Sequence, residues 1–429
     1  MRKIIEIFSQ YKGLSRSAYV IFIGRMVTNM GAFIWPLLTL IMKDKIGYSP
    51  TTIAYIFLGV GVLFLPANII GGKLADKFSR KKLIVIFDSI SIFFFMLCAF
   101  VEPGNLMMVF FVIAGLFANM EGPAFEALVA DVTKPNEREK VYSLMYLGHN
   151  LGFMFGAAIG GLLFANYLSL AFVLDGLTTL SSTILIVIFV KVIDVSSLDE
   201  SEKNEYEDTI EHDAKVSGIF KERPSILIQL IVFFFAAFVY DQWSFVLPMY
   251  MTDMFGVDLG SKYFGFVASF NAFVVISCTP ILTYLFRRLH ELPKVFMGQL
   301  LIGISYVIIM NRPAYYIFFV MMFAFTIGEI VNMLGSSPYM SRRVPSSHRG
   351  RVNSFRNIAY FVGSASGRVI MGWIVEKGGY STAFATVATI GILTTFIVAV
   401  NYFIDRKVFP KLYEGDSVLS KDTVEAVED

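Results

Sequence analysis

The sequence predicts an all-α membrane protein with twelve transmembrane helices in two six-helix bundles and with both termini in the cytoplasm. Three observations lead to this prediction. The chain of 429 residues is 56% hydrophobic and only 16% charged, whereas about a quarter of the residues in soluble domains are charged. Its apolar residues form runs long enough to cross a bilayer. Its Lys and Arg residues gather on one side of those runs.

Twelve apolar runs of 19 or more residues follow one another along the chain. The first six are residues 18–42, 52–71, 82–101, 105–130, 140–164 and 168–192, and the second six are 225–251, 262–286, 293–311, 313–340, 351–375 and 380–404. A helix of about 20 apolar residues crosses the hydrocarbon core. We therefore expect each run to be one span.

The basic stretch Gly71–Leu83 sets the orientation of these spans. It holds five cations in thirteen residues between the second and third runs. Short loops rich in Lys and Arg lie on the cytoplasmic side of a membrane. Of the 36 Lys and Arg residues, 28 fall on the side of this stretch, five on the other side, and three, Arg25, Arg356 and Arg368, inside predicted spans. Both termini are therefore expected in the cytoplasm.

The segments outside the spans complete the predicted organisation. Residues 1–17 carry apolar residues at helical spacing and no recognisable cleavable signal, which favours a short interfacial helix. Residues 193–224 contain ten acidic residues and are expected to form a flexible or partly helical cytoplasmic linker. The two bundles then occupy residues 18–192 and 225–404. An acidic cytoplasmic tail, expected to be poorly ordered, occupies residues 405–429.

The two predicted bundles share a sequence repeat at an offset of 211 residues. Arg138, Lys140, Val141 and Ser143 recur as Arg349, Arg351, Val352 and Ser354, and Gly152, Gly156 and Gly161 recur as Gly363, Gly367 and Gly372. An even number of spans separates the copies, so both have the same topology. This pattern indicates an internal duplication whose halves could rock about a site between them.

Composition excludes several classes of function. The net charge of +2 gives no reason to expect nucleic-acid binding. The only cysteines, Cys98 and Cys278, lie inside separate apolar runs, so neither a disulfide framework nor a thiolate metal site is expected. We found no arrangement of nucleophile and base, no metal-ligand cluster and no phosphate loop. We therefore expect no enzyme, no metal and no cofactor.

Around Gly71–Leu83 the sequence resembles the loop signature of the major facilitator superfamily, Gly-x-Leu-Ala-Asp-x-x-Gly-Arg-Lys. The matching residues are Gly72, Leu74, Ala75, Asp76, Arg80 and Lys81, while Ser79 stands where the family usually has Gly. The resemblance extends over nearly the whole chain and, within the superfamily, is to the bacterial drug:proton antiporter branch. It implies the major facilitator fold.

The resemblance also implies a conformational latch. In the family, the carboxylate equivalent to Asp76 faces the N-terminus of the eleventh helix and steadies the outward-open state, and neighbouring cations meet acidic groups at the end of the fourth helix. Ala130-Asp131 followed by Arg138 resembles the family's loop between spans four and five. We therefore expect the latch to comprise Gly72, Asp76, Arg80, Lys81, Asp131 and Arg138.

The fifth span resembles the glycine-rich signature of the antiporters. Gly152, Gly156, Gly160 and Gly161 are expected to be helix-packing glycines. Ala157 replaces the proline of that signature. In the fourth span, Phe111 stands where many antiporters have an arginine linked to proton movement.

Ionisable residues inside the spans are the candidates for proton coupling or substrate binding, because each costs about 2.5–3.5 kcal/mol at mid-bilayer. In the first half, Arg25 and Asn29 are one helical turn apart and share a face. We expect Arg25 to pair with a carboxylate; the alternative is that it extends to the cytoplasmic interface. Glu121 and Glu126 flank Pro123 on the fourth span, and we favour Glu121 as the proton carrier because it is nearer the middle.

His149 and three residues of the second half complete the candidates. His149 could relay protons or simply hydrogen-bond to its neighbours. Asp241 lies mid-span in a polar and aromatic cluster. Glu329 and Asn332 are three residues apart on the tenth span and are expected to share a face. The alternative for Glu329 is a buried ion pair with Arg356 or Arg368.

These observations predict a proton-coupled secondary transporter that works by alternating access and exports small amphipathic compounds, of the multidrug type, across a bacterial plasma membrane. Its expected partners are a small-molecule substrate, protons and the lipid bilayer, and we expect a monomer. One alternative is an importer or facilitator of a peptide, sugar or lipid-like solute, which the departures at Phe111 and Ala157 keep open. Another is a membrane enzyme or receptor.

Overall fold

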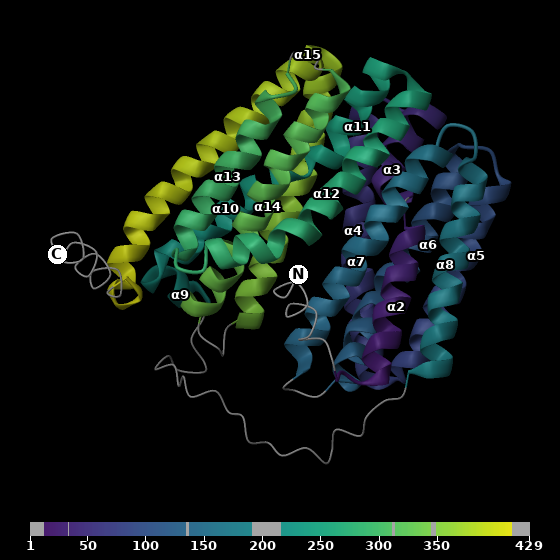
Figure 1. The fold of residues 1–429 in the computed structure, drawn as a ribbon, viewed down its shortest axis with the longest axis horizontal. Helices are drawn as coiled ribbons and strands as arrows, with labels where there is room; N and C mark the ends of the chain where they lie inside the picture. Colours follow the sequence, from purple (N-terminus) through teal and green to yellow (C-terminus); the bar gives the residue numbers. More distant parts are fainter. Residues whose placement is uncertain are drawn as a thin grey trace.

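The computed structural model of the chain describes residues 13–32, 34–133, 137–190, 216–310, 314–344 and 349–413, and the structural statements below refer to these residues. They form two groups of helices that lie side by side (Figure 1). The N-terminal half runs from α2 to α8 and the C-terminal half from α10 to α15. The short helix α9 (Val216–Glu222) leads into the second half.

The N-terminal half consists of α2 (Arg16–Gly31), α3 (Ile34–Leu40), the π-helix η1 (Ile41–Lys45), α4 (Pro50–Lys77), α5 (Arg80–Phe100), α6 (Asn105–Asp131), α7 (Arg138–Leu163) and α8 (Leu168–Phe189). The C-terminal half consists of α10 (Pro224–Tyr240), α11 (Gln242–Phe255), α12 (Val257–Leu285), α13 (Glu291–Val307), α14 (Tyr315–Arg343), α15 (Arg349–Val408) and the 3₁₀ turn η5 (Pro410–Leu412).

The described helices account for twelve crossings of a membrane. Nine helical segments are long and apolar enough to span one, and the first and sixth of these join α2 to η1 and α10 to α11. The last of the nine, α15, turns at Gly379, whose φ of 74° suits a residue without a side chain, and so supplies two crossings. The less apolar α7 and the 17-residue α13 supply the others. The predicted all-helical membrane fold is confirmed.

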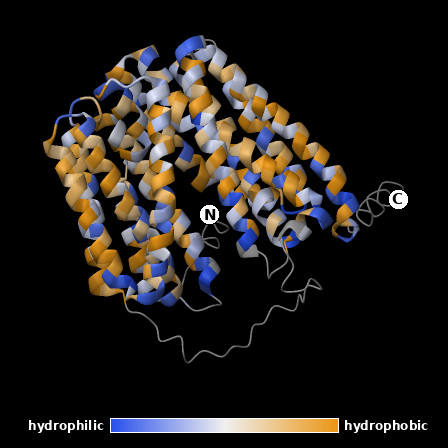
Figure 2. Ribbon diagram, turned by 180° about the vertical axis from the view of Figure 1, so that it is seen from behind, coloured by the Kyte–Doolittle hydropathy of each residue, from blue (hydrophilic) through white to orange (hydrophobic). Residues whose placement is uncertain are grey.

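The helices of both halves run between two ends of the molecule, a basic end and an outer end. The basic end contains the junction of α4 and α5, the start of α2 and the last turns of α15. The outer end contains η1, the junction of α11 and α12, and Gly379. Figure 2 shows hydrophobic residues along the flanks of both halves and hydrophilic residues gathered toward the two ends, the pattern expected of a protein surrounded by lipid.

The basic stretch between the second and third spans is mostly helical, whereas the sequence predicted a loop. Helix α4 continues to Lys77 and α5 begins at Arg80, so only Phe78 and Ser79 connect them. Ser79 has φ −58° and ψ 119°, a conformation that any residue adopts, so the turn does not need the family's glycine. Hydropathy marks only the apolar part of a helix, and hydrogen-bonded helix extends beyond the lipid.

The last helix extends beyond Asp405, where the sequence placed the start of the tail. Helix α15 continues to Val408, and the Asp405 side chain is fully buried. Its carboxylate accepts hydrogen bonds from Arg343 Nε at 2.9 and 2.8 Å, from Tyr339 at 3.0 Å and from Tyr413 at 2.6 Å. A charged residue can be buried within a helix when such partners satisfy it. Residues 1–12, 191–215 and 414–429, which include most of the predicted interfacial segment, linker and tail, lie outside the described residues.

The 211-residue repeat corresponds to equivalent packing in the two halves. Glycines of α7 lie against α2: a side-chain carbon added at Gly152 would lie 2.4 Å from the Met26 carbonyl oxygen, and one at Gly156 would lie 2.8 Å from the Asn29 carbonyl oxygen. Their counterparts Gly363 and Gly367 of α15 pack in the same way on α10. Gly160 is buried on the same helix as the first pair.

The third glycine of each copy crosses to the other half. Gly161 of α7 packs on Ser261 and Gly265 of α12, and Gly372 of α15 packs on Pro50 of α4. In each half, one glycine-rich helix therefore packs both against a helix of its own half and against a helix of the other half. This arrangement is a structural sign of duplication.

The apolar cores show where the halves join. At the outer end one continuous core includes Phe111 from the first half and Phe245 and Phe264 from the second. Toward the basic end each half has a separate core, one around Leu128 and one around Tyr339. Figure 1 shows the two groups drawn together at the outer end and apart at the basic end.

Candidate functional site

A polar cluster joins the halves at the outer end. Lys43 of η1 donates a hydrogen bond to Asp253 of α11 across the interface, and its Nζ lies 3.3 Å from Thr252 Oγ1 and 3.0 Å from Asp44 Oδ1. The Tyr380 hydroxyl donates to the second oxygen of Asp253 at 2.5 Å. Three helices from both halves thus meet at one ion pair, which closes the outer end of the interface.

At the basic end, one part of the predicted latch is formed within the first half. Arg80 Nη1 lies 3.0 Å from Asp131 Oδ2 and ties the start of α5 to the end of α6. This is the type of contact that the family resemblance implies. Lys81 donates to the carbonyl of Val190 at the end of α8. These contacts hold the basic ends of α5, α6 and α8 together.

The other part of the latch is open. Asp76 is exposed, and among the described residues it forms no hydrogen bond or ion pair with α15. Arg138 is also exposed at the start of α7, and Gly72 lies against Pro123 of α6. Within the described residues, the halves are joined at the outer end and no bond links Asp76 to the eleventh span.

The second copy of the latch pair lies where sequence reasoning did not place it. Glu291 and Arg342 occupy the positions 211 residues after Arg80 and Asp131, with the charges exchanged. Arg342 Nη1 lies 2.6 Å from Glu291 Oε1. The exchange of charge hides this pair from a comparison of residue types.

In the second half, the structure brings Glu329 together with three neutral polar groups. Tyr240 donates to Glu329 Oε1 at 2.8 Å, and the Asn271 amide donates to Oε2 at 3.1 Å. The same amide donates to Thr326 Oγ1 at 2.8 Å. Glu329 is half-buried, and no described Lys or Arg lies within 4.0 Å of its carboxylate. The alternative of an ion pair with Arg356 or Arg368 is not seen.

Asp241, unlike Glu329, has a cationic partner among the described residues. It lies at the break between α10 and α11, and its Oδ2 is 2.7 Å from Arg368 Nη2 of α15. Ser364 donates to the same oxygen. The Arg368 guanidinium also lies 4.2 Å from the centre of the Phe57 ring on α4, in the other half. The negative charge of Asp241 is thus neutralised within the protein.

The first half contributes a polar pocket of about 220 Å³ between α2, α6 and α7. It is lined by Arg25, Phe125, Glu126, Val129, Tyr142, Met145, Tyr146 and His149. The exposed Tyr142, Tyr146 and His149 follow one another at helical spacing on α7. The His149 ring stacks on Phe153 at 6.4 Å between centroids. The pocket combines one cation, one carboxylate and several aromatic rings.

Arg25 is in this pocket, but it does not form the predicted ion pair. Its guanidinium lies 5.1 Å from the centre of the Phe125 ring, and no described carboxylate oxygen is within 4.0 Å. Asn29 instead bonds to the backbone carbonyl of Arg25 at 2.7 Å and is buried against α7. Glu121 is half-buried and Glu126 exposed. The cation is held by an aromatic face rather than by an acid.

The pocket and the second-half carboxylates face the same interface. Phe153 of α7, on which the pocket residue His149 stacks, packs edge-on against Trp243 of α11, with centroids 6.5 Å apart. Asn332, predicted to share the face of Glu329, lies with its backbone against Gly298 of α13 instead. Glu329 therefore has its partners on α10 and α12.

Sequence reasoning missed several members of this site. Asn271, Thr326 and Tyr146 are polar residues inside spans, but they are not ionisable at neutral pH and were not considered. A search for amides and hydroxyls within apolar runs would have found them. The hydrogen bonds that Asn271 donates to Glu329 and Thr326 still depend on the rotation of the helices, which the sequence does not provide.

Two equivalent helical bundles, with polar groups at the interface between them, are the architecture of a secondary transporter. The chain belongs to the Major Facilitator Superfamily, whose family model matches residues 20–311 and 293–418. It is a multi-pass membrane transporter and not an enzyme.

Comparison with individual proteins gives three similarities. A Na(+), Li(+), K(+)/H(+) antiporter of Planococcus maritimus is 24% identical over 412 residues, which cover 90% of this chain and 96% of the relative. Multidrug resistance protein MdtH of Yersinia enterocolitica is 28% identical over 158 residues, 36% of this chain and 39% of the relative. The crystal structure of a POT family transporter in complex with 5-aminolevulinic acid is 15% identical with a TM-score of 0.72, and the match covers 93% of this chain and 99% of that one. The last similarity supports the fold alone.

Proposed function

We propose that this protein is a proton-coupled antiporter of a bacterial plasma membrane, with its basic end in the cytoplasm, and that it exports a cation in exchange for protons. The observation that carries the proposal is Glu329. It is a carboxylate inside a membrane span whose partners, Tyr240 and Asn271, are neutral donors. Asp241, by contrast, has Arg368 at 2.7 Å. Glu329 needs a positive charge from solution.

A single unpaired carboxylate can produce obligatory exchange. An ionised carboxylate inside a membrane costs about 2.5–3.5 kcal/mol or more unless it is neutralised. Either a proton or a cationic substrate can neutralise Glu329, but they compete for the same oxygens. The halves must pass through a closed, water-poor state to change their orientation, and the empty, ionised site is disfavoured there. Only the loaded forms complete the cycle, so each cation leaves as protons enter.

The exposed groups around Glu329 support a cationic substrate. The carboxylate faces an interface that is open toward the basic end, where α7 presents Tyr146 and His149. Aromatic faces attract cations, and they suit the small amphipathic compounds that multidrug exporters carry. The partial similarity to MdtH agrees with this substrate class. The proton gradient of a bacterial plasma membrane, directed inward, would drive the export.

An alkali cation is the second candidate for the substrate. The similarity to the Na(+), Li(+), K(+)/H(+) antiporter extends over nearly the whole of both chains, unlike that to MdtH. Glu329, Thr326 and the amide of Asn271 also offer hard oxygen atoms within one hydrogen-bonded group. Such atoms are the ligands that hard cations prefer. The same exchange mechanism applies to either cation.

Proteoliposomes that contain the purified protein test the proposal. With an internal acid load and a fluorescent pH indicator, we expect the transported cation, added outside, to dissipate the pH gradient. Na⁺, Li⁺ and K⁺ form one arm of the experiment and lipophilic organic cations such as ethidium the other. Neutral peptides and sugars are the comparison: an importer that carries them inward together with protons would acidify the lumen further and would not dissipate the gradient. A gradient that no cation dissipates would refute the proposal.

A further inference from the structure

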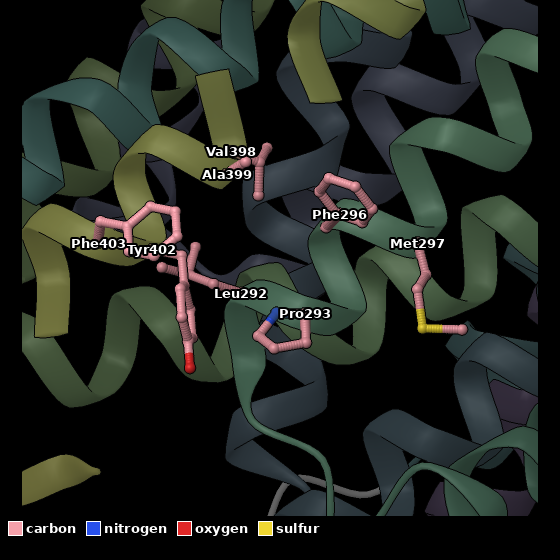
Figure 3. Close-up of a pocket in the computed structure, with 8 residues that line it drawn as sticks. All are labelled: Leu292, Pro293, Phe296, Met297, Val398, Ala399, Tyr402 and Phe403. Atoms are coloured by element: carbon pink, nitrogen blue, oxygen red, sulfur yellow. The ribbon is translucent and has the colours of Figure 1, made fainter. Parts of the chain in front are cut away.

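A second site lies on the side of the molecule away from the interface between the halves. Near the basic end, a groove of about 260 Å³ separates α13 from the last turns of α15. It is lined by Leu292, Pro293, Phe296, Met297, Val398, Ala399, Tyr402 and Phe403, all shown in Figure 3. We propose that this groove binds an acyl chain of an anionic phospholipid from the cytoplasmic leaflet.

The groove opens toward the lipid. On α15, Leu393, Phe396, Val400 and Phe403 are each at least 56% exposed and form one apolar stripe beside the groove. On α13, the exposed Met297, Ile304 and Val307 continue the same surface. Figure 1 shows α13 and the C-terminal part of α15 at the edge of the molecule farthest from the first half. In a membrane protein this apolar surface is covered by hydrocarbon.

Cations lie just beyond the apolar lining. Arg406 and Lys407 are each one helical turn beyond lining residues Tyr402 and Phe403, so they continue the same side of α15. Both cations are exposed, and neither forms an ion pair with a described carboxylate. In Figure 3 the hydroxyl of Tyr402 is directed away from Val398. Polar and cationic groups therefore mark one end of an apolar groove.

This combination fits a phospholipid better than other occupants. The apolar lining matches an acyl chain, while free cations at the basic end match a negative headgroup in the cytoplasmic leaflet. A neutral lipid would use the groove but gain nothing from Arg406 and Lys407. A second copy of the chain would need an acidic surface opposite these cations, whereas the same face of a symmetric partner would present the same cations.

The test measures lipid binding by the purified full-length protein. Thermal denaturation in detergent is followed while phosphatidylglycerol or phosphatidylcholine with identical acyl chains is added. We expect phosphatidylglycerol to raise the melting temperature at lower concentrations than phosphatidylcholine. Arg406→Gln and Lys407→Gln should each weaken the response to phosphatidylglycerol about fivefold and leave that to phosphatidylcholine unchanged.

A second variant tests the groove itself. Ala399→Leu should fill it and reduce the response to both lipids, whereas Val400→Leu, on the exposed stripe beside it, should not. Light scattering measures the mass of the same samples. Equal responses of wild type to the two lipids, or a normal response of Ala399→Leu, would overturn the proposal. So would a dimer that Ala399→Leu converts to monomer, because the occupant would then be a second copy.

Discussion

Lys43 is predicted to set the balance between the conformations of this transporter. It is bonded to Asp253 across the interface at the outer end, so this ion pair exists only while that end is closed. The Lys43 side chain is 16% exposed and that of Asp253 is 48% exposed. Partial exposure limits the pair to about 1 kcal/mol, the upper part of the range for accessible ion pairs. Lys43→Met should therefore shift the ratio of outer-closed to outer-open molecules about fivefold.

Pulsed electron paramagnetic resonance can measure this shift. Spin labels at the exposed Glu102 and Lys377, at the outer end of the two halves, should report a larger population of long distances in Lys43→Met. Lys262→Met is the matched control, because Lys262 pairs at 2.9 Å with Asp258 on its own helix and does not join the halves. Equal distance distributions in the two variants would refute the role of Lys43.

Three further predictions concern stability and packing. Arg343 is fully buried with Asp405, so Arg343→Gln should lower the free energy of unfolding by about 3–5 kcal/mol. The control is Arg342→Gln, at a side chain 62% exposed, which should lower it by about 1 kcal/mol or less. Thermal denaturation measures both. A side-chain carbon at Gly161 would lie 2.7 Å from the Ser261 carbonyl oxygen across the interface, so Gly161→Ala should slow transport in proteoliposomes. Gly122→Ala should not slow it, because a side-chain carbon there would meet no described atom within 4 Å. Arg368→Gln should lower the melting temperature, because it leaves the buried Asp241 carboxylate without its cation. Adding Asp241→Asn should restore much of the loss. A double variant no more stable than Arg368→Gln alone would contradict this pairing.

The layout of the membrane spans could be predicted from the sequence because a bilayer imposes a simple physical rule. Long apolar runs must be helices that satisfy their own backbone, and cations must lie outside the lipid. The ion pair of Arg80 with Asp131 was implied by the family resemblance. The packing of Gly161 and Gly372 across the interface follows the repeat between the halves. Each of these features depends on local sequence or on a periodic match.

The partners of the ionisable residues could not be predicted in the same way. Hydropathy places Glu329, Asp241 and Arg25 inside spans, but it does not give the rotation of each helix about its axis. In the part of the chain that the structure describes, Asp241 pairs with Arg368, Glu329 has neutral partners and Arg25 lies on an aromatic ring. Asp405 shows the same limit. Its position after an apolar run predicts a solvent-exposed carboxylate, but the structure places Arg343, 62 residues earlier in the chain, beside it.

The central claim is that one carboxylate, Glu329, binds either a proton or the exported cation. Adding the transported cation to purified protein in weakly buffered solution, with a pH indicator, measures this competition directly. We predict that the wild type and Asp258→Asn, a change at the exposed outer end, release protons when the cation binds. Glu329→Gln should release none and should bind the cation more weakly. Proton release by Glu329→Gln equal to that of the wild type would contradict the account.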